Sequence, residues 1–179
     1  MPRLFAGLEI PPSVALALSG LRGGLPGARW IEPADYHITL RFVGDIDDRT
    51  ADELVHALDR VERTEFQVRL AGIDVFGADK PHSVYARVEP TPELKELQAD
   101  LERLCQRLGL KPEPRKFTPH VTLARLRRSN PAEVAGWLAL RGGFTAQPFL
   151  VEQFTLFSAR ESVGGGPYLV EETYPLRAW

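Results

Sequence analysis

The tetrapeptide His-Ile-Thr-Leu at residues 37–40 recurs as His-Val-Thr-Leu at residues 120–123, and 120 − 37 gives an interval of 83 residues. In an extended strand, residues i and i+2 point to the same face. Each copy therefore presents an imidazole and a hydroxyl on one face and two aliphatic side chains on the other. Two such strands lying side by side would form one cleft, with the aliphatic side chains in the core.

The two motif histidines, His37 and His120, are half of the four histidines in the chain. A single histidine in an apolar strand is usually structural, but a repeated motif favours function. An imidazole titrates near pH 6.5, so a neighbouring pair can hold one proton donor and one proton acceptor. We expect Thr39 and Thr122 to donate hydrogen bonds to the non-bridging oxygens of a phosphate. This chemistry requires no metal and no cofactor.

The bulk composition is that of a soluble globular protein. With 179 residues, we expect one domain, 1–179, made of two closely joined lobes. The formal net charge of −2 argues against generic polyanion binding. The single cysteine, Cys105, borders a leucine stripe at helical spacing and is predicted to lie in the core. Glu9 and the Pro11-Pro12 pair interrupt the apolar N-terminal segment, so we expect no membrane span and a cytoplasmic location.

Basic residues concentrate around the second motif. Segment 103–128 holds eight of them: Arg103, Arg107, Lys111, Arg115, Lys116, Arg125, Arg127 and Arg128. Beside two histidines, this charge favours a phosphate-bearing substrate.

Hydrophobic periodicity and punctuating Gly and Pro residues predict the order of elements. Strands are predicted near 3–10, 37–43, 66–76, 83–88, 149–158 and 168–174, and helices near 12–22, 48–63, 91–109 and 131–140. Gly164 to Pro167 is predicted to join the last two strands as a hairpin turn. Strands and helices mix without a regular βαβ rhythm, which favours an α+β fold with antiparallel sheets and outer helices. A strand followed by a helix recurs after both motifs, which suggests an internal duplication.

The paired motifs resemble the two-histidine phosphoesterase superfamily, and specifically its RNA 2′,3′-cyclic phosphodiesterases, also called 2′-5′ RNA ligases. The resemblance extends over most of the chain. It includes residues 3–6, Trp30, 37–44, 119–125, 154–158 and 166–168.

This resemblance implies a bilobal, pseudo-twofold α+β fold in which two antiparallel-rich sheets flank a central cleft and both motifs lie on the cleft floor. It implies hydrolysis of a 2′,3′-cyclic phosphate at an RNA end, such as that of a tRNA fragment, to a 2′-phosphomonoester. Some members also join RNA through 2′-5′ linkages. By matching position, His37 would be the general acid and His120 the general base. The residues by themselves leave this assignment open.

Two arginines are further candidates for phosphate binding. By resemblance, Arg125 would supply positive charge at the phosphate. Five residues past His120, it falls on the opposite face of an ideal strand, so it reaches the site only if the strand bends or bulges. Arg41 shares the His37 face of an ideal strand and is a second candidate. The same alternation assigns Phe42 to the opposite, core face.

The sequence alone leaves three other functions open. The chain could be a phosphodiesterase for small cyclic nucleotides, because only the surface outside the cleft decides substrate length. It could also be an RNA-binding module without catalysis. A zinc or dinuclear hydrolase is a third hypothesis, although the histidines and carboxylates show no metal-ligand spacing. We expect a monomer.

Overall fold

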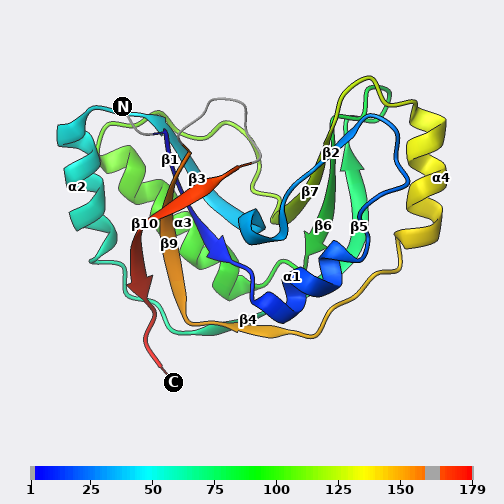
Figure 1. Cartoon of the computed structure of the whole chain (residues 1–179). Helices are drawn as coiled ribbons and strands as arrows, with labels where there is room; N and C mark the ends of the chain where they lie inside the picture. Colours follow the sequence, from blue (N-terminus) through cyan, green and yellow to red (C-terminus); the bar gives the residue numbers. More distant parts are fainter. Residues whose placement is uncertain (1–2, 160–165, 179) are drawn as a thin grey trace.

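The structure, a computed structural model, describes residues 3–159 and 166–178. Figure 1 shows two lobes arranged as a U, with helices on the outside of both arms. The strands form an eight-stranded sheet in the order β10-β9-β1-β3-β7-β6-β5, and β2 pairs with β7. All of its strand pairs are antiparallel. The predicted α+β fold with antiparallel sheets is therefore confirmed.

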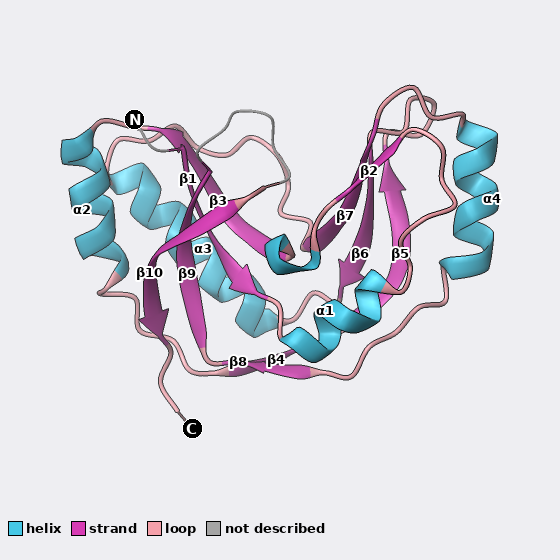
Figure 2. Ribbon diagram, viewed as in Figure 1, coloured by secondary structure: helices cyan, strands magenta, loops and turns pink. Residues whose placement is uncertain are grey.

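Lobe 1 consists of four strands and two helices. Its strands are β1 (Arg3–Glu9), β3 (His37–Asp45), β9 (Gln153–Ala159) and β10 (Tyr168–Pro175), and its helices are α2 (Asp48–Leu58) and α3 (Pro92–Arg107). Both helices lie on the outer side of these strands (Figures 1 and 2).

Lobe 2 contains β2 (Ala28–Trp30), β5 (Leu70–Phe76), β6 (Ser83–Val88) and β7 (His120–Leu126), with α4 (Pro131–Arg141) outside them. Helix α1 (Pro12–Ser19) contacts η1 (Pro33–Asp35), a single 3-10 turn that leads into β3. Strands β4 (Phe66–Val68) and β8 (Phe149–Val151) pair with each other below both lobes (Figure 2).

The structure differs in one respect from the expected two antiparallel-rich sheets. Strands β3 and β7 pair through one residue pair, Ile38 with Val121, so the halves form one continuous sheet. Because the two strands diverge on either side of this pair, the sheet opens into two arms (Figure 1). Both motif histidines immediately precede the paired residues, and the fold thereby brings the two motifs together.

The order of elements repeats along the chain. The 83-residue interval between the motifs recurs between the starts of α2 and α4, of β4 and β8, and of β5 and β9, since 131 − 48, 149 − 66 and 153 − 70 all equal 83. This is the pattern that an internal duplication would leave, although a common origin of the two halves stays a prediction.

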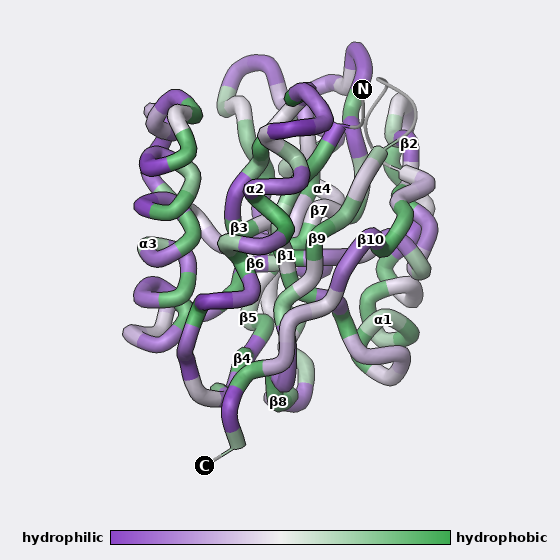
Figure 3. The backbone as a smooth tube through the Cα atoms, turned by 90° about the vertical axis from the view of Figure 1, so that its left-hand side faces the viewer, coloured by the Kyte–Doolittle hydropathy of each residue, from purple (hydrophilic) through white to green (hydrophobic). Residues whose placement is uncertain are grey.

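The residues that the sequence predicted at the starts of α3 and α4 cap these helices in the structure. Thr91 caps α3 by accepting a hydrogen bond from the backbone N–H of Leu94 at 3.3 Å, and Asn130 caps α4 by accepting one from Ala132 at 2.7 Å. The leucine stripe of α3 is buried with Cys105, which is 1% exposed, and burial raises the pKa of this thiol to about 11. Hydropathy alternates along α3 (Figure 3). The predicted 164–167 turn lies partly outside the described residues.

Candidate functional site

The two motif strands carry the same irregularity. In β3, Gly7 of β1 pairs with Thr39 and the next residue, Ala6, pairs with Arg41, so Leu40 is an extra residue in a β-bulge. In β7, Tyr85 pairs with Thr122 and Val84 pairs with Ala124, so Leu123 is the extra residue. A bulge shifts the alternation of side chains by one position. The residues beyond each bulge therefore change faces.

The bulge in β7 resolves the position of Arg125. Val121, Leu123, Ala124 and Leu126 are buried, whereas Arg125 is exposed with the half-buried motif residues. Arg125 therefore shares one side of the strand with His120 and Thr122. We call this side of β3 and β7, marked by His37 and His120, the motif face. The condition for Arg125 to reach the motif face, a bend or bulge in its strand, is therefore met, and its role at a phosphate stays a prediction.

The bulge in β3 shows that the interpretation of Arg41 was wrong. Arg41 lies on the opposite face and is 6% exposed, and its Nε donates a hydrogen bond to Glu102 of α3 at 2.7 Å. It also donates to the backbone carbonyls of Phe42 and Lys111. Arg41 is therefore a structural residue that joins β3 to α3, and it does not face the histidines.

Phe42 lies on the motif face, whereas the sequence predicted that it would lie on the core face. It is the register partner of Phe5, whose ring centroid lies 4.8 Å from that of His37, and it is 44% exposed. The predicted core position of Phe42 was therefore wrong, because the alternation was counted without the bulge. Phe42 occupies in β3 the place that Arg125 occupies in β7, since 125 − 42 again equals 83.

Both histidines are held in the same way. The Nδ1–H of His37 donates to the backbone carbonyl of Asp35 at 2.9 Å, and that of His120 donates to the carbonyl of Thr118 at 2.6 Å. Because carbonyls only accept, each neutral ring keeps its proton on Nδ1 and has Nε2 as its basic atom. The Thr39 hydroxyl donates to His37 Nε2 at 2.9 Å. The geometry thus leaves two Nε2 atoms for proton transfer.

Aromatic rings surround each imidazole. His37 lies within 4.8 to 5.7 Å, between ring centroids, of three rings: Phe5, Phe157 and Tyr168. Two rings of lobe 2, Phe76 and Tyr85, lie 5.0 and 5.4 Å from His120. Sequence patterns gave no sign of these neighbours, because they come from strands distant along the chain.

This environment changes the acidity of both histidines. The pKa of His37 is lowered from 6.5 to about 4, mainly by burial and also by the positive charges of His120 and Arg125, while the Asp35 carbonyl and carboxylate oppose the shift. Burial also lowers the pKa of His120, with added effects from Arg125 and Arg115 and an opposing one from the Thr118 carbonyl. The Ile38–Val121 pair brings the two histidines together, and the bulge in β7 places Arg125 on the same face.

The remaining histidines lie outside the motifs, and two residues of the basic segment are paired with carboxylates. His56 and His82 are exposed outside the motifs. Arg103 pairs with Asp100, and Arg115 pairs with Glu113. The positive charge of the basic segment is therefore partly compensated at these two positions.

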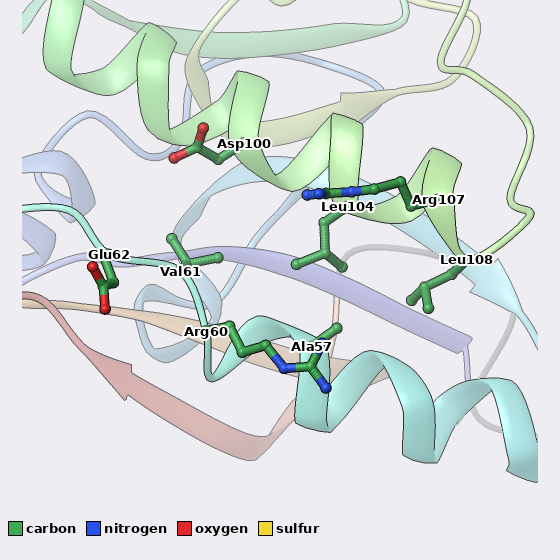
Figure 4. A pocket seen from close by; sticks show the side chains of 8 residues that line it. All are labelled: Ala57, Arg60, Val61, Glu62, Asp100, Leu104, Arg107 and Leu108. Atoms are coloured by element: carbon green, nitrogen blue, oxygen red, sulfur yellow. The ribbon is translucent and has the colours of Figure 1, made fainter.

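Arg107 lines a pocket of about 380 Å³ between α3 and the end of α2 (Figure 4). The other lining residues are Ala57, Arg60, Val61, Glu62, Asp100, Leu104 and Leu108. None of the sequence-predicted site residues lines this pocket.

Within residues 3–159 and 166–178, no group of three or more His, Cys, Asp or Glu side chains is placed to hold a metal ion. None of the helices in this part of the chain is long and apolar enough to cross a membrane.

Comparison with known proteins gives similar sequences and folds. Residues 10–162 match the family model of the 2′-5′ RNA ligase superfamily. A curated RNA 2′,3′-cyclic phosphodiesterase of Aeropyrum pernix is 35% identical over 62% of this chain, and one of Geobacillus stearothermophilus is 36% identical over 68%. The matched stretches span 65% and 41% of these two relatives. A solved structure from Thermus thermophilus is 24% identical, with a TM-score of 0.82 and 98% of each chain covered, which shows a shared fold.

Proposed function

Since the chain belongs to the 2′-5′ RNA ligase superfamily, we propose that it hydrolyses 2′,3′-cyclic phosphate ends of RNA to 2′-phosphomonoesters. The observation that carries this proposal is the pair of histidines whose Nε2 atoms are available for proton transfer beside the guanidinium of Arg125. The names of the Aeropyrum pernix and Geobacillus stearothermophilus relatives support the same reaction. Residues 1–179 act in this proposal as a single domain of two intertwined lobes.

The reaction follows from where the protons must go. His120 Nε2 takes a proton from water as the water oxygen attacks phosphorus, and His37 Nε2 gives a proton to O3′ as the P–O3′ bond breaks. The product keeps the phosphate on O2′ and a free 3′ hydroxyl. Arg125, Thr39 and Thr122 stabilise the charge on the non-bridging oxygens.

The roles of the two histidines are assigned by family resemblance. The pKa of His37 is lowered to about 4, so its imidazole has to gain a proton before it can act as the acid, and the imidazolium then gives that proton up readily. A substrate with sulfur in place of O3′ separates the roles, because a thiolate leaves without a proton. We expect this substrate to restore turnover to His37→Ala and not to His120→Ala. Rescue of His120→Ala alone would reverse the assignment.

RNA is favoured over a substrate without a base because of Phe42. An aromatic ring exposed on the motif face offers a flat surface on which a nucleobase can stack. Small cyclic nucleotides also carry a base and a cyclic phosphate, so they remain the second candidate. Fragments of tRNA are one source of such ends, and 2′-5′ ligation would use the same two histidines in the reverse direction.

The proposal is tested by incubating the full chain with an RNA that ends in a 2′,3′-cyclic phosphate, in EDTA. We expect a product whose terminal phosphate is at the 2′ position. A 3′-phosphate product, or activity that EDTA abolishes, would overturn the mechanism, and the latter would favour a metal hydrolase. RNA binding without turnover would favour a binding module.

A further inference from the structure

Arg29 is a cation on the motif face that the proposed reaction does not use. In β2 it pairs in register with Arg125 of β7, and paired residues of neighbouring strands share a face. The next residue, Trp30, points the other way and lies 5.7 Å from Trp137 of α4, between ring centroids. Because α4 covers the outer side of lobe 2 (Figure 1), Arg29 lies on the opposite side, with Arg125.

The charge of Arg29 is not compensated by the described part of the protein. Arg29 and Arg125 are exposed, and so is Arg127, which lies two residues further along the chain from Arg125. Among the described residues, none of these three arginines has a carboxylate within 4 Å. In contrast, many arginines elsewhere are paired with carboxylates, including Arg3, Arg22, Arg41, Arg49, Arg63, Arg87, Arg103, Arg115 and Arg177.

Like charges opposite each other on paired strands destabilise the pair. The arrangement of Arg29 beside Arg125 therefore becomes favourable when anions bind both guanidinium groups. The cyclic phosphate carries one negative charge, and Arg125 already faces the histidines that would act on it. A second anion next to the first would compensate the charge of Arg29. In an RNA strand this anion is the phosphodiester that precedes the terminal nucleotide, and a cyclic mononucleotide lacks it.

We propose that Arg29 binds the RNA phosphodiester adjacent to the cyclic end, and so makes the protein select RNA strands over cyclic mononucleotides. This inference rests on the proposed function, because it assumes that the cyclic phosphate lies at the histidines.

The test compares wild type with Arg29→Gln on two substrates, a short RNA with a cyclic-phosphate end and the corresponding cyclic mononucleotide. A hydrogen bond to a charged group is worth about 1.5–3 kcal/mol, so we expect kcat/KM on the RNA to fall roughly tenfold or more. We expect kcat/KM on the mononucleotide to stay unchanged. Replacing the last phosphodiester by an uncharged methylphosphonate should remove the difference between wild type and variant.

Two further variants control for general effects of charge. Arg29→Lys keeps the positive charge and should recover part of the RNA preference. Arg49→Gln removes an arginine that is 90% exposed and paired with Glu53 on α2, and should change neither substrate's kcat/KM. An equal loss on both substrates with Arg29→Gln, or no loss on RNA, would overturn the inference.

The salt dependence of RNA affinity tests the role of Arg29 without requiring hydrolysis, so it separates failure of this inference from failure of the proposed function. Each phosphate contact adds about 0.7 to the slope of log affinity against log salt for a single strand. We expect Arg29→Gln to reduce this slope by that amount with a 2′-phosphate-ended RNA. If wild type binds RNA but hydrolyses no cyclic phosphate, the proposed function fails and the slope still tests Arg29. An unchanged slope, or no RNA binding by wild type, would contradict the role of Arg29.

Discussion

At the scale of single residues, the site depends on two imidazoles whose neutral forms are favoured. Each ring lies among aromatic side chains, and each Nδ1–H is held by a backbone carbonyl two residues earlier in the chain. The carbonyl fixes the tautomer, and the aromatic surroundings reduce the affinity for a proton.

The lowered pKa values predict the pH dependence of catalysis. The active form needs one imidazole protonated and the other neutral, so kcat/KM should follow a bell-shaped curve. Because burial lowers the pKa of His37 to about 4 and also lowers that of His120, the maximum should lie below pH 6.5. Steady-state rates at low substrate concentration, measured across the range from acid to mildly alkaline pH, check this. A value of kcat/KM that still rises above neutral pH would contradict it.

The same shift predicts how stability depends on pH. The unfolded chain protonates His37 near pH 6.5, whereas the folded protein keeps it neutral down to about pH 4. The unfolded state thus binds more protons in this interval, and the free energy of unfolding falls as the pH drops from 6.5 to about 4. We expect His37→Gln to show a smaller fall than wild type in urea unfolding. The control His56→Gln, at an exposed position, should follow the wild-type curve.

Phe42 gives a prediction for base recognition. If a nucleobase stacks on this ring, Phe42→Ala should weaken RNA binding by about 1–3 kcal/mol, which appears mainly as a higher KM. Phe42→Trp should retain binding. Leu140→Ala, which truncates a side chain that is 84% exposed on α4, is the matched control. An unchanged KM for Phe42→Ala on every RNA would remove Phe42 from the binding site.

At the scale of secondary structure, the matched bulges decide which residues face the site. Strand alternation predicted the faces of His37, Thr39, His120 and Thr122, because these positions precede the bulges. Beyond the bulges the same rule assigned Arg41 and Phe42 to the wrong faces. A bulge depends on pairing with a neighbouring strand, which is not visible in the motif itself. Strand alternation also assigned Arg125 to the face opposite His120, and only the family resemblance predicted that it lies near the phosphate.

The corrected position of Arg41 predicts an effect on stability rather than on catalysis. Its ion pair with Glu102 is largely buried, with exposed fractions of 6% and 18%. Removing one partner leaves an unpaired buried charge, so Arg41→Ala should lower the free energy of unfolding by about 3–5 kcal/mol. Denaturant unfolding measures this, and KM of the folded fraction should not change. A large rise in KM without loss of stability would instead place Arg41 at the substrate.

At the scale of the whole molecule, the sheet is the feature that assembles the site. The chain passes repeatedly between the lobes, and its two motifs meet where β3 and β7 share the pair Ile38 and Val121. The repeated tetrapeptide and the element order were enough to predict an α+β fold with paired motifs. The single continuous sheet and the Arg29–Arg125 register could not be predicted, because both depend on pairing between strands that are distant in sequence.

If His37 and His120 act together as an acid–base pair, turnover of cyclic-phosphate RNA should be lost in each alanine variant and in the double variant. General acid–base catalysis contributes about 10²–10⁴-fold, so each single variant should lose at least that much. Because the two groups act as a unit, the double variant should lose little more than either single one. Near wild-type turnover in either single variant would show that the two histidines do not act as an acid–base pair.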